Sequence, residues 1–580
     1  MNLAIDLGTS YTKIGMLEET GAFINLVGAE SMIPTVAAYV PRTGRLYFGA
    51  AAANLRETGM RVGKFFKIEI KRNPGYRLGP YRLPDILAYF LEYVRDEYVA
   101  GQMKEVTSVA ICVPNYFGLK ARRVVLEAAC RAFPATPVRL VLEPLAALAG
   151  LWQEREPARQ PLPSGDIMVV DIGGGTADVS FVHVSRGTGT GMTLEAQLHA
   201  GSDAFSGSEV DRAILRHVLF PRFELQTGQH IPAVFREEKG MSPEEEYQYA
   251  RMLGWAEEIK LKIDRRGHVR VDLPDFYQGR SLCLDLTEEE LASALENTLA
   301  SLRQFLEARV KPRARQLGLY GKNGYDLDLV VLMGGSARLK GVKTVMAEIG
   351  TEIWLPPEPE FYVVKGLSYL GAPQGRETGP QMKGIVPFRF YIEKRAPGKA
   401  DTNTLEPVPF DTANLELDPS KTYRIFSVPC DSAYNLGREQ GLVRFRMYQG
   451  EAGEGDEPGE IRTDTESLVL DTCQRREDVP GDEVDIYLDL PASCLKTSLD
   501  GGEGLESPGD TPAGQLWQQA LARQQQMVSS ILELDGERYK ALETFASQLE
   551  DLRGDPAYSY QNYEALLIAK LLAFFAVLQK

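Results

Sequence analysis

The sequence is poor in the residues that build metal–thiolate sites or disulfide frameworks. Its six cysteines are scattered over 580 residues without a Cys-x-x-Cys pair, and its five histidines are not grouped with them. Neither a zinc site nor a disulfide framework is therefore expected, and the cytoplasm is the expected compartment. The first predicted strand starts at residue 3, without the basic segment and apolar run that a secretory signal requires.

Basic clusters and long apolar runs are scarce as well. Lys and Arg number 64 against 80 Asp and Glu, which gives a formal net charge of −16, and no basic stripe stands out. A nucleic-acid partner is not expected, because such partners are bound through concentrated positive charge. The one long apolar stretch, residues 565–578, contains Lys570 and is shorter than the roughly 20 residues that span a bilayer. No membrane span is therefore expected.

Residues 168–182 predict a β-hairpin with a glycine turn. Apolar residues lead into Asp171, and apolar β-branched residues resume after Asp178. Between them stand Gly173, Gly174, Gly175 and Thr176. A turn without Cβ atoms lets backbone N–H groups approach a phosphate, while the threonine and the two aspartates offer oxygens to a magnesium ion or its waters. The alternative is an ordinary glycine turn with two solvated carboxylates.

The N-terminus repeats this pattern. Residues 3–15 read as an apolar strand that ends at Asp6, a turn, and a returning strand. The turn carries a glycine and hydroxyl groups, in Gly8, Thr9, Ser10 and Tyr11. Two such hairpins can face one triphosphate from opposite sides, which favours a nucleotide-phosphate site over an ordinary turn.

Further candidate charges stand at the ends of predicted elements. Lys71 follows an alternating run, where a solvated strand end is the simpler interpretation. One predicted buried strand ends at Pro114. The next ends at Glu143, before a helix that opens on Pro144, a residue suited to a first helical turn.

Taken together, these segments resemble the actin-like ATPase domain of the heat-shock protein 70 chaperone family over residues 1–373. The matching stretches stand in the family's order and are 5–12, 70–72, 113–117, 143–149, 169–180 and 333–338. The resemblance implies an α/β, two-lobed, actin-like ATPase fold that clamps ATP or ADP with Mg²⁺ between its lobes. One departure is the short spacing from Lys71 to Pro114, which leaves little room for the accessory subdomain that the chaperones carry there.

The resemblance assigns roles to these residues. It implies that Asp6 and Asp171 hold the magnesium shell, with Asp178 as a further metal candidate, and that residues 8–11 and 173–175 bind phosphates. Catalytic roles are implied for Lys71, Glu143, Asp171 and Thr176. Lys71 steadies the γ-phosphate and the attacking water, Glu143 orients that water, and Thr176 binds the γ-phosphate. Such a set suffices, because phosphoryl transfer needs positioning and charge neutralisation more than covalent chemistry.

The nucleoside side is expected in the second lobe. Gly207 lies in a glycine turn before a helix that resembles the family's, and Glu257 and Lys260 fit ribose and adenine contacts on a predicted helix over 246–264. The alternative for these charges is a solvated helix face with i,i+3 pairing. Leu261 stands where the family commonly has an arginine that stacks on the base. A buried strand over 328–333 carries the adenosine-side candidates at its carboxyl end, namely Gly334, Gly335, Ser336 and Arg338. Glu360, in the segment that closes the domain, replaces the family's usual Asp.

Beyond residue 373 the resemblance weakens. Residues 374–384 read as a turn-rich linker without the leucines that dock the chaperone linker. Alternating runs over 385–500 predict an antiparallel β-sandwich, a possible degenerate substrate-binding domain. Residues 501–514 read as a flexible linker, and 515–580 as a helical tail whose apolar last helix packs on its neighbour or docks a partner.

The preferred hypothesis is an ATP-hydrolysing, chaperone-like protein in which nucleotide state controls the binding of a protein client, with co-chaperones as further partners. The alternative is a nucleotide-switched scaffold or assembly protein with one dedicated partner and no general chaperone activity. A sugar or acid kinase of the same superfamily is disfavoured, because the Lys71 and Pro114 segments match chaperones rather than kinases.

Overall fold

The computed structural model describes most of the first 371 residues and parts of the chain up to residue 500. The described ranges are 1–18, 20–28, 31–55, 60–64, 66–73, 75–102, 104–155, 162–186, 192–371, 381–384, 388–395, 403–408, 422–451, 468–479, 481–489 and 494–500. The predicted linker over 501–514 and the helical tail over 515–580 lie outside them. The chain divides into two compact units, residues 1–387 with 413–419, and residues 388–412 with 420–580.

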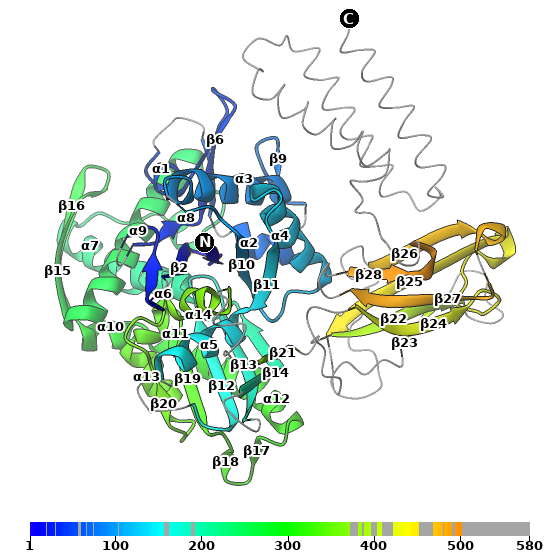
Figure 1. Ribbon diagram of the computed structural model, residues 1–580. Helices are drawn as coiled ribbons and strands as arrows, with labels where there is room; N and C mark the ends of the chain where they lie inside the picture. Colours follow the sequence, from blue (N-terminus) through cyan, green and yellow to red (C-terminus); the bar gives the residue numbers. More distant parts are fainter. Residues whose placement is uncertain are drawn as a thin grey trace, which may run out of the picture. The chain divides into compact units, whose positions relative to one another are not determined.

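The first unit begins with a six-stranded sheet in the order β11-β10-β1-β2-β3, with β4 attached to β2 (Figure 1). Its strands are β1 (Asn2–Asp6), β2 (Tyr11–Leu17), β3 (Phe23–Asn25), β4 (Ile33–Pro34), β10 (Ser108–Val113) and β11 (Val138–Leu142). β1 runs parallel to β10 and antiparallel to β2, so the predicted N-terminal hairpin is present. The helices of this lobe are α3 (Leu83–Val94), α4 (Leu119–Ala132), α5 (Glu143–Arg155) and α14 (Tyr362–Gly371).

A second six-stranded sheet repeats this arrangement in the order β20-β19-β12-β13-β14-β21. Its strands are β12 (Gly165–Ile172), β13 (Ala177–Arg186), β14 (Met192–Ser202), β19 (Leu329–Met333), β20 (Ile353–Trp354) and β21 (Gln381–Gly384). β12 pairs antiparallel with β13 and parallel with β19, just as β1 pairs with β2 and β10. The last of these strands, residues 381–384, falls within the expected linker but pairs in parallel with β14.

Strand β12 is buried on both faces, which explains its unbroken apolar run. Ile167 and Val169 belong to a core shared with the first lobe, whereas Met168 and Val170 belong to the core of the second lobe. A strand covered on both faces reads as continuously hydrophobic rather than alternating. The structure therefore confirms the expected α/β class, with a sheet at the centre of each of two lobes.

Smaller elements complete the lobes. A three-stranded sheet of β5 (Val36–Val40), β6 (Arg45–Phe48) and β7 (Arg61–Lys64) precedes α2 (Phe66–Arg72). The second lobe holds α6 (Gly207–Ile214) and α9 (Pro243–Arg266), which begins with a capping box between Ser242 and Glu245 and ends at left-handed Gly267. The other elements are α1 (Gly49–Asn54), β8 (Arg77–Leu78), β9 (Tyr81–Arg82), η1 (Arg95–Val99), η2 (Leu215–Leu219), α7 (Phe220–Thr227), α8 (Ala233–Glu237), β15 (His268–Tyr277), β16 (Arg280–Thr287), α10 (Glu288–Ala294), α11 (Glu296–Phe305), η3 (Leu306–Val310), α12 (Lys311–Gln316), β17 (Tyr320–Gly321), β18 (Gly324–Tyr325), η4 (Gly335–Arg338) and α13 (Lys340–Ala347).

The described part of the second unit forms two antiparallel sheets, ordered β23-β22-β25-β26 and β24-β27-β28. Their strands are β22 (Phe388–Arg395), β23 (Asn403–Pro407), β24 (Thr422–Pro429), β25 (Leu442–Glu451), β26 (Leu468–Arg475), β27 (Glu483–Asp489) and β28 (Cys494–Thr497), with short turns η5 (Arg438–Gln440), η6 (Arg476–Asp478) and η7 (Ser498–Asp500). Alternate residues of each sheet are buried, such as Phe445 in β25 and Ile486 in β27. This alternation is typical of a β-sandwich.

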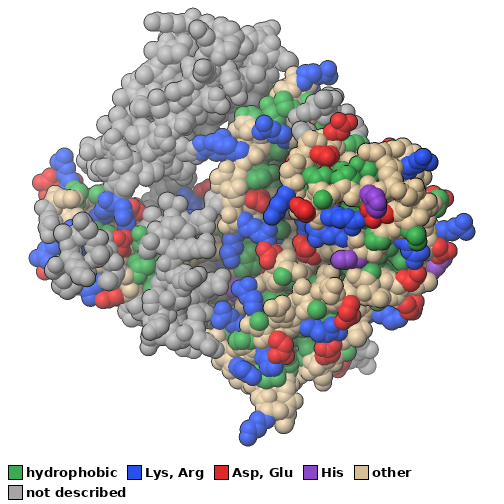
Figure 2. Space-filling view, turned by 180° about the vertical axis from the view of Figure 1, so that it is seen from behind, with side chains coloured by type: hydrophobic (Ala, Val, Ile, Leu, Met, Phe, Trp, Pro, Cys, Tyr) green, Lys and Arg blue, Asp and Glu red, His purple; other side chains and the backbone are tan. Residues whose placement is uncertain are grey.

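The surface of the protein carries charges of both signs. Figure 2 shows Lys and Arg side chains interspersed with Asp and Glu side chains over the face in view. Within the described ranges, no helix is both long and apolar enough to cross a membrane.

Candidate functional site

The two glycine turns meet each other. A Cβ atom added at Gly174 would lie 1.9 Å from Oγ of Ser10, and one added at Gly175 would lie 2.5 Å from Cγ2 of Thr9. At distances this short, a side chain at either glycine would force the neighbouring side chains to move. The turn of β12–β13 therefore lies against the turn of β1–β2, as the repeated sequence pattern predicts.

Two other segments reach the same turns from the second lobe. The backbone N–H of Gly207, at the start of α6, donates to O of Gly173 at 2.9 Å, and a Cβ atom at Gly207 would lie 2.7 Å from Oγ of Ser336. Gly334, at the end of β19, has a φ of 79° and leaves no room for a side chain beside Oδ1 of Asp171. The predicted adenosine-side segment thus lies next to the second hairpin.

Four carboxylates lie close together beside these turns. Asp6 ends β1, Glu143 opens α5, and Asp171 and Asp178 lie directly opposite each other in the β12–β13 register. Burial, with repulsion from Glu143 and Asp6, raises the pKa of Asp171 to about 7. Burial raises the pKa of Asp178 to about 8, although Thr176 Oγ1 donates to its Oδ2 at 2.7 Å. Raised carboxyl pKa values indicate buried negative charge that is not fully compensated.

These carboxylates fit a divalent cation. Oδ1 of Asp178 is buried and has no hydrogen-bond partner among the described residues. An unpaired buried oxygen is costly, and hard carboxylate oxygens are the ligands that Mg²⁺ prefers. Asp171, beside Asp178, is the natural second donor.

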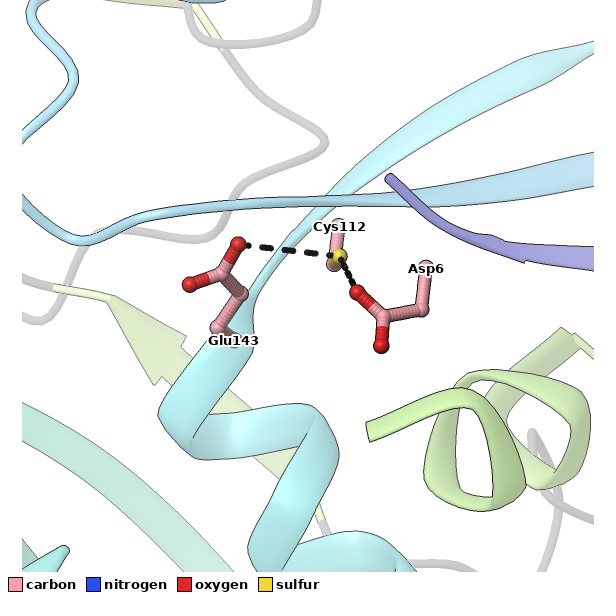
Figure 3. Close-up of side chains that lie close together, drawn as sticks. All are labelled: Asp6, Cys112 and Glu143. Carbon is pink, nitrogen blue, oxygen red and sulfur yellow. Dashed lines mark hydrogen bonds between the residues drawn. The ribbon is translucent and has the colours of Figure 1, made fainter. Parts of the chain in front are cut away.

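Cys112, for which the sequence pattern predicts no role, lies among these acids. Figure 3 shows its sulfur between the carboxylates of Asp6 and Glu143. Sγ is 3.2 Å from Oδ1 of Asp6 and 3.8 Å from Oε1 of Glu143. The three residues hold their potential ligand atoms within 4.8 Å of one another. Burial, with the two neighbouring acids, raises the pKa of the Cys112 thiol well above its usual value. The sulfur is therefore a thiol that donates to Asp6, rather than a thiolate ligand.

The ammonium group beside Glu143 belongs to Lys67, not to Lys71. Nζ of Lys67 lies 2.7 Å from Oε1 of Glu143, and both side chains are buried. Burial alone would lower the pKa of Lys67, but attraction to Glu143 outweighs it and raises that pKa. Lys71 lies one turn further along α2 with an exposed side chain, and its Nζ is 5.1 Å from the centroid of the Tyr116 ring.

A sequence signal for Lys67 existed. It is a single charge inside the apolar run of residues 65–68, and a charged side chain in such a run is buried only when it is paired. The alternating pattern also suggested a strand, whereas residues 66–72 form helix α2.

Residues of α9 face the site from the second lobe. Tyr11 donates its hydroxyl to Oε1 of Glu257 at 3.0 Å. Lys260 is buried, with Nζ 2.7 Å from Oδ1 of Asp211 and 3.1 Å from O of Gly207. A solvated helix face therefore does not describe Glu257 and Lys260. Leu261, next along the helix, is 47% exposed.

Arg338 is held at the end of β19. Its Nη2 donates to both carboxylate oxygens of Glu360, at 2.9 Å each. Glu360, which replaces the aspartate expected from the resemblance, thus fixes the guanidinium group of an adenosine-side candidate.

A polar cavity of about 470 Å³ opens between α2 and α6 next to Gly175. Its volume is within the usual range of small-molecule sites. Arg72 and Asp203, which form an ion pair, both line it. The cavity therefore gives space for a polar ligand beside the second glycine turn.

A protein-family model matches about the middle half of the chain. The model described as Hsp70 protein matches residues 66–352. This range begins in α2 and contains Glu143, the second glycine hairpin, α9 and β19.

Proposed function

This chain belongs to the Hsp70 family and has that family's actin-like ATPase fold, and on this premise we propose that it binds ATP or ADP with Mg²⁺ and hydrolyses ATP. Family membership itself supports a nucleotide-binding, chaperone-like role. The observation that carries the proposal is the meeting of two glycine turns beside four buried or half-buried carboxylates and the Lys67–Glu143 pair.

The proposed roles follow from charge and position. Backbone N–H groups of the two turns bind phosphates, because a turn of glycines presents donors without steric hindrance. Asp171 and Asp178 hold the magnesium ion, which when bound supplies charge neutralisation and orientation of the phosphates. Thr176 contacts the γ-phosphate. Lys67 takes the role expected of Lys71.

Lys67 and Glu143 have separate roles at the γ-phosphate. The Lys67 ammonium group stabilises the charge that develops on the transferred phosphoryl group. Glu143, whose direction is fixed by its 2.7 Å contact with Lys67, orients the attacking water and accepts its proton. Cys112 restrains the carboxylate of Asp6 by donating to its Oδ1.

Equilibrium binding tests the nucleotide site. Calorimetry of the full chain should find one site for ATP or ADP in the presence of Mg²⁺, and Asp171→Asn with Asp178→Asn should weaken Mg²⁺-dependent binding at least tenfold. Wild-type affinity in that double variant would refute the proposed metal site.

We further propose that nucleotide state controls how the β-rich unit binds a protein client. This proposal is supported by family membership and by the antiparallel sheets of residues 388–500. The alternative, a scaffold with one dedicated partner, is favoured by a segment after α14 that lacks docking leucines and continues into β21 of the ATPase sheet. Binding to a panel of unfolded peptides, measured in ATP and in ADP, separates the chaperone from the scaffold. Binding to many peptides that ATP weakens supports a chaperone, and no binding to any peptide of the panel supports the scaffold.

A further inference from the structure

A second buried ammonium group, that of Lys13, lies beside the proposed metal site. Lys13 is directly opposite Asp6 in the antiparallel β1–β2 pair, so both side chains extend from the same face of the sheet. Its Nζ lies 3.0 Å from Oδ2 of Asp6, and the side chains are 13% and 7% exposed. Burying this pair costs desolvation energy that the attraction between the two charges rarely offsets. Stability alone therefore does not account for the pair.

The Lys13 ammonium group is next to the first glycine turn. Its Nζ lies 3.4 Å from the position that a Cβ atom would take at Gly8. The backbone N–H of Gly8 donates to O of Asp6 at 3.0 Å, which holds the turn against the same aspartate. A phosphate group bound by this turn comes within reach of Nζ, because lysine carries its charge on a flexible stem.

Asp6 is already engaged on both of its oxygens. Oδ2 pairs with Lys13, and Oδ1 accepts from Cys112 Sγ at 3.2 Å. Among the four carboxylates of the site, the buried oxygen without a hydrogen-bond partner in the described residues is Oδ1 of Asp178. The site thus offers its free ligand atom to a cation on the second hairpin, whereas the first hairpin already holds a cation of its own.

The formal charges agree with a metal ion on the second hairpin and the Lys13 ammonium group on the first. The four carboxylates of Asp6, Glu143, Asp171 and Asp178 face two ammonium groups, those of Lys13 and Lys67. With all six groups ionised, two negative charges remain, and one divalent cation balances them. Lys13 keeps a positive charge beside the first glycine turn whether or not a metal ion is bound.

We infer that Lys13 is a phosphate-binding residue: Asp6 positions its ammonium group at the first glycine turn, where it contacts the phosphate chain of the bound nucleotide. This inference rests on the proposed nucleotide-binding function and adds to it a residue and a property. The property is that nucleotide affinity depends only partly on the divalent cation, because Lys13 neutralises part of the phosphate charge.

The test compares nucleotide affinities in EDTA, measured by calorimetry on the full chain with ADP and with adenosine as probes. The key variant, Asp6→Asn with Lys13→Met, removes both charges of the pair and leaves no unpaired buried ion. Without metal, losing the Asp6 carboxylate reduces repulsion and should tighten phosphate binding. Any loss of ADP affinity in this variant must therefore come from Lys13.

We expect the double variant to raise the Kd for ADP in EDTA about tenfold or more, because a hydrogen bond to a charged group contributes at least that much. Adenosine affinity should change by less than about twofold, since it has no phosphate, and Lys13→Arg, which keeps the charge, should retain most of the ADP affinity. Thermal unfolding of each variant checks that the fold is intact.

Three results would overturn the inference: unchanged or tighter ADP binding by the double variant in EDTA, an equal loss for adenosine, or a wild-type chain that binds ADP only when Mg²⁺ is present. In each of these the proposed nucleotide-binding function survives. A wild-type chain that binds ADP neither with nor without Mg²⁺ overturns that function together with the inference.

Discussion

Replacing Lys67 with methionine tests which ammonium group acts at the γ-phosphate. Nζ of Lys67 lies 2.7 Å from Oε1 of Glu143, and the two side chains are 6% and 13% exposed. Removing one preorganised electrostatic donor typically lowers kcat by about 10²–10³, or about 2.7–4 kcal/mol of barrier. Lys67→Met should therefore slow hydrolysis at least about a hundredfold. ATP affinity should fall by less than about tenfold, because the glycine turns still bind the phosphates.

The same substitution should lower stability, because it leaves the Glu143 carboxylate buried without its partner. Breaking a buried ion pair from one side costs about 3–5 kcal/mol. Lys67→Met combined with Glu143→Gln removes both charges and should recover most of the lost Tm without recovering turnover. This double variant separates the loss of catalysis from the loss of stability.

Lys71→Met is the matched comparison on the same helix. Its ammonium group contacts the Tyr116 ring at 5.1 Å, and such a contact at an exposed site contributes about 0.5–1 kcal/mol. Turnover should stay within about fivefold of wild type, which is the rate equivalent of about 1 kcal/mol. The assay is phosphate release with saturating Mg-ATP, together with nucleotide affinity for each variant. Slow hydrolysis by Lys71→Met beside normal hydrolysis by Lys67→Met would refute the reassignment.

Burial raises the pKa of Asp171 to about 7 and that of Asp178 to about 8. Between about pH 5 and 8 the native state therefore holds more protons than the unfolded chain. The free energy of unfolding in EDTA should consequently fall as pH rises. Urea unfolding at several pH values measures this, Mg²⁺ should flatten the decline, and a free energy that rises over this range would contradict it. Gly174→Ala should weaken nucleotide binding at least about tenfold, because its methyl group meets Ser10 Oγ at 1.9 Å. The control is Gly254→Ala on α9, where the added methyl group meets no other atom within 4 Å. This control should stabilise the helix by about 0.5–1 kcal/mol and leave nucleotide binding unchanged. Equal affinity in both variants would show that the turns do not form the phosphate site. Coupling between nucleotide and the β-rich unit should be weaker than in the chaperones but measurable, so hydrogen exchange over residues 388–500 should differ between ATP and ADP, and identical exchange in the two nucleotides would refute the proposed nucleotide control.

Much of the arrangement of the candidate site could be predicted because its residues stand at the ends of strongly apolar strands. The strand ending at Asp6 and the hairpin from Asp171 to Asp178 are local patterns that a few adjacent residues determine. Glu143 opens α5 as expected, since Pro144 suits a first helical turn. The alternating runs beyond residue 385 were likewise sufficient to predict antiparallel sheets.

The pairing of charges could not be predicted in the same way, because it depends on tertiary contacts. Ile68 and Ile70 have β-branched side chains that favour strands, yet burial of Phe66 and Ile70 in the first lobe places this segment in a helix. That helix brings Lys67 to Glu143, 76 residues away in the sequence. Cys112 was overlooked for a related reason, since its contact with Asp6 spans 106 residues and needs no cysteine motif.

Single-turnover hydrolysis tests the central claim most directly. The full chain is loaded with ATP in EDTA, mixed with excess Mg²⁺, and assayed for phosphate over time, with Glu143→Gln measured in parallel. The structure predicts one phosphate released per chain after Mg²⁺ is added, and release at least about a hundredfold slower in Glu143→Gln. Bound ATP that stays intact in the wild-type chain after Mg²⁺ is added, or equal rates in the two proteins, would contradict the proposal that these residues form an ATPase site.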